Sequence, residues 1–182
     1  MSRIPVLSRD EMDPEQQKVY DETVAMTGRV GRGPSVGYAY SPGLWRVHTA
    51  SSAHLSDCSL TPAQVRIVSL LTARHWKAAY PWSAQAAGAL AAGLDRDVIE
   101  AINAGEKPKF RDRTDEMVHA VARGLLATGS LGDDMFKAAE STLGYQRLAD
   151  VVGVIGHFST TSMMANVVGA EPPPDAASHL KR

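Results

Sequence analysis

Residues 60–93 have the sequence LTPAQVRIVSLLTARHWKAAYPWSAQAAGALAAG, which predicts two helices joined by a short turn. Thr61 is followed by a proline and, two positions after that, by a glutamine, and this pattern is typical of a helix N-terminus. The first helix is expected to run to about Trp76, and the second begins around a proline and ends at a glycine. Because so short a turn favours antiparallel packing, Arg66 and Gln85 are expected to approach each other.

The remaining sequence repeats these helix signals and lacks the alternation of polar and apolar residues that marks a strand. Further helices are expected after Asp13, after Ser41, after Asp95, over 114–128, and from about Asp133 through a kink near Gly144 to Val168. The prediction is an all-α, single-domain helical bundle over residues 1–182. An N-terminal arm (about 1–12) and a proline-rich tail (about 170–182) flank it, and the tail is expected to be loose or draped over a partner.

Charge and cysteine content exclude several classes of partner. Nineteen Lys and Arg residues oppose 20 Asp and Glu residues without a like-charged run, so no nucleic-acid partner is expected. No apolar stretch reaches the roughly 18 residues of a membrane span, and the N-terminus lacks the apolar core of a signal peptide. No membrane contact and a cytoplasmic location are therefore expected. Cys58 is the one cysteine, which excludes an intrachain dithiol cycle.

Several short motifs follow one another in and around the helix pair. They are Leu60-Thr61-Pro62, Arg66, Tyr80-Pro81-Trp82-Ser83-Ala84-Gln85 and Ala92-Gly93-Leu94, with further similarity at Arg3-Ile4-Pro5 and from Leu143-Gly144 to Phe158. Their order resembles the core of the carboxymuconolactone decarboxylase and alkylhydroperoxidase-D-like superfamily. The resemblance implies an all-helical alkylhydroperoxidase-D-like fold and a homo-oligomer, either a trimer or a hexamer.

The positions that carry chemistry in this superfamily differ here. Its peroxidase branch has Glu, Cys, Cys and His where this sequence has Arg66, Ala78, Pro81 and Gln85. Alanine and proline cannot form a thiolate, and glutamine cannot take up a proton near neutral pH. Dithiol peroxidase activity is therefore not expected. The decarboxylase-type branch has a Tyr-x-Trp-x-x-His segment, of which the Tyr and Trp are present and the His is not.

Four residues of the helix pair are candidates for substrate binding. Arg66 offers a planar guanidinium that suits a substrate carboxylate, and pairing with a carboxylate across a subunit contact is an equal alternative. Tyr80, Trp82 and Gln85 are expected to shape the pocket. For the aromatic residues, plain core or interface packing is the alternative interpretation.

Two of the six histidines are candidate proton carriers. His75 ends the first helix close to the turn, and His157 lies in the apolar run 154–158. The alternatives are a cation at a helix C-terminus for His75 and a hydrogen-bonded core residue for His157. His119 is expected at the polar edge of its helix, without a role. The sequence has no metal, nucleotide or flavin motif, so no metal and no cofactor are expected.

The leading functional hypothesis is a divergent member of this superfamily that acts without a cofactor on a small organic acid or lactone. The reaction would be that of a lyase, such as a decarboxylase, or of an isomerase. Loss of the superfamily's catalytic positions favours a second hypothesis, an oligomeric ligand-binding or scaffold protein without activity. A third hypothesis is hydroperoxide reduction by Cys58 alone with an external thiol.

Overall fold

The fold is built from helices. The computed structural model describes residues 2–181, and within that range it has eight α-helices, one short 3-10 helix and no strand. In chain order these are η1 (Arg9–Glu11), α1 (Pro14–Thr27), α2 (Pro34–Tyr38), α3 (Pro42–Ser56), α4 (Pro62–His75), α5 (Ala79–Ala91), α6 (Arg96–Ala104), α7 (Arg113–Thr128) and α8 (Asp133–Val168). The predicted all-α class is confirmed.

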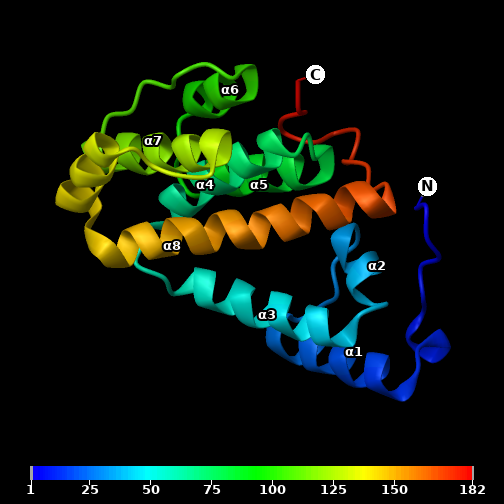
Figure 1. Cartoon of the computed structure of the whole chain (residues 1–182). Coiled ribbons are helices and arrows are strands. Elements are labelled where there is room, and N and C mark those ends of the chain that lie inside the picture. Colours follow the sequence, from blue (N-terminus) through cyan, green and yellow to red (C-terminus); the bar gives the residue numbers. More distant parts are fainter. Residues whose placement is uncertain (1, 182) are drawn as a thin grey trace.

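Helix α8 lies between two layers of helices (Figure 1). Helices α4, α5 and α7 pack on one side of α8, with α6 packed on α4 and α5, and α1 to α3 lie on the other side. Val68 of α4 and Val154 of α8 are fully buried in one apolar cluster, and Ile67 of α4 belongs to a second cluster with α5 and α6. Trp45 anchors a third cluster between α1, α2 and α3. Because α4 contributes to two of the three clusters, it is the rigid element from which site residues project.

The helix ends follow the local sequence. The side chains of Asp13 and Thr61 accept hydrogen bonds from backbone N–H groups in the first turns of α1 and α4, as predicted. Gly144 has φ of 71° and interrupts α8 where the kink was expected. Helix α2 was not predicted. Its Gly37 lies so close to α8 that an added Cβ would be 2.1 Å from Met164 Sδ, so this glycine permits the two helices to approach.

The C-terminal tail packs on its own chain, and the expectation of a loose tail is wrong. Ser178 is buried, and its hydroxyl accepts a hydrogen bond of 3.2 Å from Trp82 Nε1 in α5. Asn103 of α6 donates from Nδ2 to the His179 carbonyl at 2.9 Å and accepts from the Lys181 backbone N–H at 2.8 Å. Prolines in the tail prevent a helix but leave the backbone free to pair with these side chains.

Helix α8 is also the one helix within residues 2–181 that is long and apolar enough to cross a membrane by length and composition. This helix was not identified from the sequence, because an unbroken apolar stretch was required there and the apolar part of α8 includes polar residues. The core helix of a soluble protein passes the same test. Here Val151, Val154 and Phe158 of α8 are buried against α4 and α7, which gives the apolar character a packing role.

Asp150 of α8 ties the loop after α3 to the bundle. The side chain is buried, and its Oδ2 accepts a 2.8 Å hydrogen bond from the Ser59 backbone N–H and a second bond from the Ser59 hydroxyl. His54 Nε2 lies 3.3 Å from Oδ1. Burial raises the pKa of Asp150, but the bonds from Ser59 and His54 outweigh it, so the pKa lies below its ordinary value.

We expect Asp150→Ala to lower the free energy of unfolding by about 2 kcal/mol, because two partly buried donors of Ser59 would lose their acceptor. The measurement is urea denaturation at pH 7.5. The matched control is Asp57→Ala, an exposed carboxylate in the same loop, for which a change within about 0.5 kcal/mol is expected. Equal losses in the two variants would contradict the anchoring role of Asp150.

Candidate functional site

A cavity with a volume of about 770 Å³ opens between α4, α6, α7 and the C-terminal tail. Its apolar lining comes from Leu71, Ala79, Ile102, Leu126, Ala127 and Leu180. Its ionisable lining consists of four cations, two histidines and one carboxylate, namely Arg74, Lys77, Arg123, Lys181, His75, His119 and Glu106. The cavity thus combines an apolar surface with an excess of positive charge.

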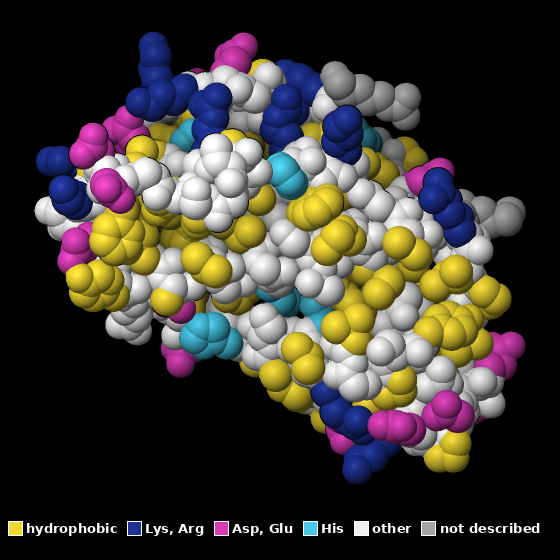
Figure 2. Space-filling model, viewed as in Figure 1, with side chains coloured by type: hydrophobic (Ala, Val, Ile, Leu, Met, Phe, Trp, Pro, Cys, Tyr) yellow, Lys and Arg dark blue, Asp and Glu magenta, His cyan; other side chains and the backbone are white. Residues whose placement is uncertain are grey.

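The cations of this cavity are poorly neutralised by the protein itself. Lys181 Nζ lies 3.3 Å from Glu100 Oε2, but Arg74, Lys77 and Arg123 have no carboxylate partner among residues 2–181. Lys and Arg side chains also gather along the edge of the molecule that carries α6 and α7 (Figure 2), whereas the face over α3 and α8 is mostly uncharged. Such a local excess of positive charge attracts anions to the cavity.

Arg74 is held in place at the centre of the cavity. It projects from the last turn of α4, and its Nη1 donates to the backbone carbonyl of Asn103 in α6. Gly105 gives the guanidinium room, because an added Cβ there would lie 2.8 Å from Arg74 Nη2. One bond to a carbonyl uses only part of the donor fork of an arginine, so Arg74 keeps N–H groups for a carboxylate.

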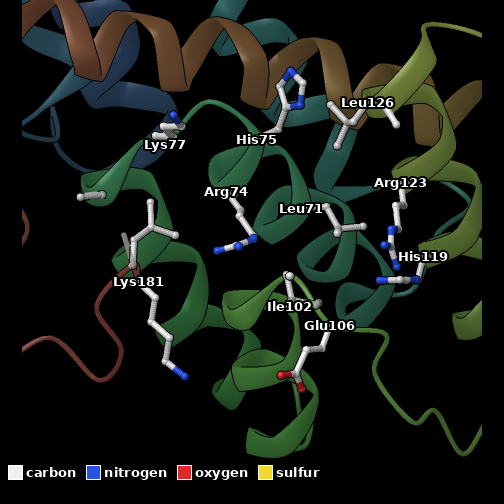
Figure 3. A pocket seen from close by; sticks show the side chains of 14 residues that line it. Leu71, Arg74, His75, Lys77, Ile102, Glu106, His119, Arg123, Leu126 and Lys181 are labelled. Atoms are coloured by element: carbon white, nitrogen blue, oxygen red, sulfur yellow. The ribbon is translucent and has the colours of Figure 1, made fainter.

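His119 of α7 lines the same cavity, beside Arg123 (Figure 3). Only 2% of its surface is exposed, and its Nε2 is buried without a hydrogen-bond partner among residues 2–181. Burial, with smaller contributions from the charges of Arg123 and Lys107, lowers the pKa of His119 to about 4. The imidazole is therefore neutral near pH 7.

The expectation that His119 lies at the polar edge of α7 is wrong. Its ring centroid lies 5.3 Å from that of Phe110, in the segment between α6 and α7, and this contact covers the ring. Helical spacing alone describes α7 as an isolated cylinder and cannot show which residue the preceding segment will cover. An aromatic residue shortly before a helix was the only signal for this contact in the sequence.

His75 also lines the cavity, from the last residue of α4, and its side chain is exposed. Figure 3 shows its ring at the rim, away from Arg74 at the centre. Of the residues predicted for the site, His75 is the one that the structure places in this cavity. The C-terminal position on α4 is also compatible with the alternative, in which the imidazole interacts with the helix dipole.

Arg66 and Gln85 meet as the antiparallel packing predicts, but outside this cavity. Arg66 Nη1 donates to Gln85 Oε1, which also accepts a 3.2 Å bond from the Ser69 hydroxyl. Burial lowers the pKa of the half-buried Arg66, and no carboxylate among residues 2–181 pairs with it. His75 comes nine residues after Arg66, which is two and a half helical turns, so the two side chains leave α4 on opposite faces.

Tyr80 and Trp82 do not line the cavity either. Trp82 is fully buried among α4, α5 and α6, and its Nε1 bonds the tail. The Tyr80 hydroxyl donates to the Arg32 carbonyl at 3.0 Å, and its ring lies against Gly33. The aromatic residues of the Tyr-x-Trp segment thus connect α5 to the tail and to the loop before α2.

His157 belongs to a column of rings between α2, α3 and α8. Its ring stacks on that of His48 with a centroid distance of 4.4 Å, and His48 stacks on Tyr38 at 4.3 Å. His157 Nδ1 lies 3.1 Å from the Ser51 hydroxyl. Burial lowers the pKa of each histidine to about 4, and the nearby His48 also lowers that of His157. This geometry agrees with the alternative of a hydrogen-bonded core residue.

Thiol and metal chemistry have little support from the arrangement of side chains. Cys58 is partly buried, and its Sγ lies 3.6 Å from the Leu55 carbonyl, away from the lining of the cavity. Ala78 and Pro81, at the positions of the superfamily's thiols, are buried. Among residues 2–181, no three His, Cys, Asp or Glu side chains are grouped so that they could hold a metal ion.

Comparison with known proteins finds similarity at the level of the fold. The chain is similar to the crystal structure of an alkylhydroperoxidase AhpD core, an uncharacterized peroxidase-related protein from Ralstonia eutropha JMP134. The TM-score is 0.74 and the sequence identity 19%, over 96% of this chain and 93% of that one. No family model and no curated protein matches the sequence.

Proposed function

We propose that this chain, which has the alkylhydroperoxidase-D-like fold, binds a small-molecule organic acid or lactone in the cavity between α4, α6 and α7. The observation that carries the proposal is the pair of arginines in the lining, Arg74 and Arg123, which lack a carboxylate of their own within residues 2–181. An anion that enters the cavity supplies the missing partner. The apolar lining then contacts the rest of the molecule, as in most ligand sites.

The proposed chemistry is proton transfer without a cofactor. A neutral histidine that lines the cavity can take a proton from a carbon of the bound acid and return it to another position, while an arginine stabilises the negative charge that develops. His119 and His75 are the two histidines in the lining. We place His119 first because its Nε2 has no partner among the described residues, although its lowered pKa makes it a weaker base than a free imidazole.

Arg66 remains a separate proposal for carboxylate binding, on another face of α4. Its guanidinium is half-buried without a carboxylate partner, but its side chain is packed against Gly88, where an added Cβ would be 2.8 Å from Arg66 Cζ. We give the cavity precedence because it offers both space for a ligand and histidines that could move a proton.

The first test fills the cavity. We expect Ala127→Trp to abolish binding of benzoate, succinate and muconolactone as measured by calorimetry, because the indole would occupy space in the cavity that Ala127 lines. The matched control is Ala138→Trp, on the exposed surface of α8 and outside the lining, which should bind as the wild type does. If neither these three probes nor the longer monocarboxylates titrated below bind the wild-type protein, the proposal is refuted.

A second test separates an enzyme from a binding protein that lacks activity. Any acid that binds is incubated in D2O, and exchange of its carbon-bound protons is followed by NMR. Loss of exchange in His119→Gln, with binding retained, would support proton transfer by His119. The same loss in His75→Gln alone would assign that role to His75. Binding without exchange in the wild type would favour the non-catalytic alternative.

A further inference from the structure

The cavity is much larger than a small polar acid requires. Its volume of about 770 Å³ lies within the range of roughly 300 to 1,000 Å³ that typically holds drug-sized ligands. A two- or three-carbon acid bound to one arginine would leave most of the apolar lining in contact with water. A ligand that fills this space must carry a substantial apolar part.

Apolar residues of the cavity lie next to Arg74. Figure 3 shows Leu71 and Ile102 beside the Arg74 side chain, between Lys181 on one side and His119 with Arg123 on the other. Buried apolar area contributes roughly 25 cal/mol per Å² to the free energy of binding. A charged ligand whose hydrocarbon chain lies on these residues would therefore bind more tightly than its charged group alone.

The C-terminal tail forms one wall of the cavity and is positioned for that role. Leu180 belongs to the lining and packs against the apolar cluster of α4, α5 and α6. Asn103 holds the backbone on both sides of Leu180, through the His179 carbonyl and the Lys181 N–H. The same residue accepts the bond from Arg74 through its own carbonyl. One buried asparagine therefore fixes both the apolar wall and the central cation.

The charges of the lining favour one carboxylate near Arg74. Arg74 is partly buried, central and without an acidic partner within residues 2–181, whereas Lys181 already contacts Glu100. Glu106 is the single carboxylate of the lining and would repel a second negative group that crosses the cavity. A planar carboxylate matches the free N–H groups of a guanidinium.

We infer that the ligand of this cavity is an amphipathic monocarboxylate of the medium-chain fatty-acid type. Its head group binds Arg74, and its hydrocarbon body lies on Leu71, Ile102 and Leu180. The inference rests on the proposed function, since it specifies the class of acid that the cavity accepts.

The test is isothermal titration of the full chain with butanoate, hexanoate, octanoate and the uncharged 1-octanol. A fully buried methylene is worth about a fourfold gain in affinity, and partial burial in an open cavity reduces this gain. We expect octanoate to bind about tenfold or more tighter than butanoate, with hexanoate in between. Octanol should bind at least about tenfold more weakly than octanoate, because it lacks the charge that pairs with Arg74.

Three variants assign the contacts. Arg74→Met keeps an apolar stem without the charge and should weaken octanoate about tenfold or more. Leu180→Ser should reduce the ratio between octanoate and butanoate affinities, because the longer chain loses more contact with the tail. Arg111→Met is the matched control, because Arg111 pairs with Asp95 at 3.2 Å outside the lining and its loss should change neither affinity. Circular dichroism verifies the fold of each variant, and Leu180→Ser tests the inference if Arg74→Met does not fold.

The outcomes separate this inference from the proposed function. Equal affinities for butanoate and octanoate would overturn the amphipathic class while leaving acid binding in place. Octanol that binds as tightly as octanoate would overturn the assignment of the head group to Arg74. If no carboxylate of any length binds, in this series or among the smaller acids, the proposed function itself is refuted.

Discussion

Lowering the pH from 7.5 to 5 is expected to reduce the free energy of unfolding by about 3 kcal/mol, because three histidines are buried in their neutral form. Burial lowers the pKa of His48, His119 and His157 to about 4, against an ordinary value of 6.5. In the unfolded chain these imidazoles take up protons as the pH falls below about 6.5, while in the folded chain they stay neutral until about 4. The unfolded state thus binds more protons between these values, and stability falls with pH in that window.

The size of the effect follows from the shifts and from partial exposure. Each pKa unit corresponds to about 1.4 kcal/mol, and only the part of the shift that lies above pH 5 contributes to this comparison. None of the three side chains is completely removed from water, so solvent screening reduces the combined loss of stability from the three histidines to about 3 kcal/mol. Below pH 4 both states are protonated, and these histidines cause no further loss.

Replacing one imidazole by a ring that cannot titrate should remove about a third of this pH dependence. His48→Phe keeps an aromatic ring between Tyr38 and His157, whose centroids lie 4.3 and 4.4 Å from that of His48. The measurement is urea denaturation of wild type and variant at pH 7.5 and 5. The control, His179→Phe, changes an exposed residue of the tail. A wild-type stability that is the same at both pH values would contradict the burial of these rings as neutral groups.

The helices were predictable because their signals are local. Asp13 and Thr61 bond backbone groups within the next three residues, and Gly144 adopts a positive φ that other residues avoid. The antiparallel contact of Arg66 with Gln85 followed from the short turn between α4 and α5. Features of this kind depend on a few neighbouring residues and can be inferred without knowing the tertiary packing.

The cavity was not predictable because its lining comes from segments far apart in the sequence. Arg74, His119 and Lys181 meet only when α6, α7 and the tail pack around the end of α4. The sequence motif directed attention to Arg66, Tyr80 and the other residues that face away from this cavity. For His119, burial depends on the fold of the segment around Phe110, which helical periodicity does not describe.

We expect Trp82→Ala to lower the free energy of unfolding by about 4 kcal/mol, because the change removes a large side chain from the core. Trp82 has no exposed surface and packs with Ile67, Ile99 and their neighbours in the cluster of α4, α5 and α6. This expectation differs from that for a substrate-binding residue in a pocket, whose removal would reduce affinity with little change in stability. Chemical denaturation at pH 7.5 measures the difference.

Trp82→Phe separates the packing of the indole from its hydrogen bond to the tail. Phenylalanine fills most of the space but cannot donate to the Ser178 hydroxyl, which also bonds Glu100 at 3.1 Å. We therefore expect a loss of about 1 to 2 kcal/mol, well below that of the alanine variant. Because the hydrogen bonds of Asn103 still hold the tail beside the cavity, octanoate binding should change less in this variant than in Leu180→Ser. A Trp82→Phe variant with wild-type stability and no ligand binding would instead return Trp82 to the binding site, as the sequence motif suggests.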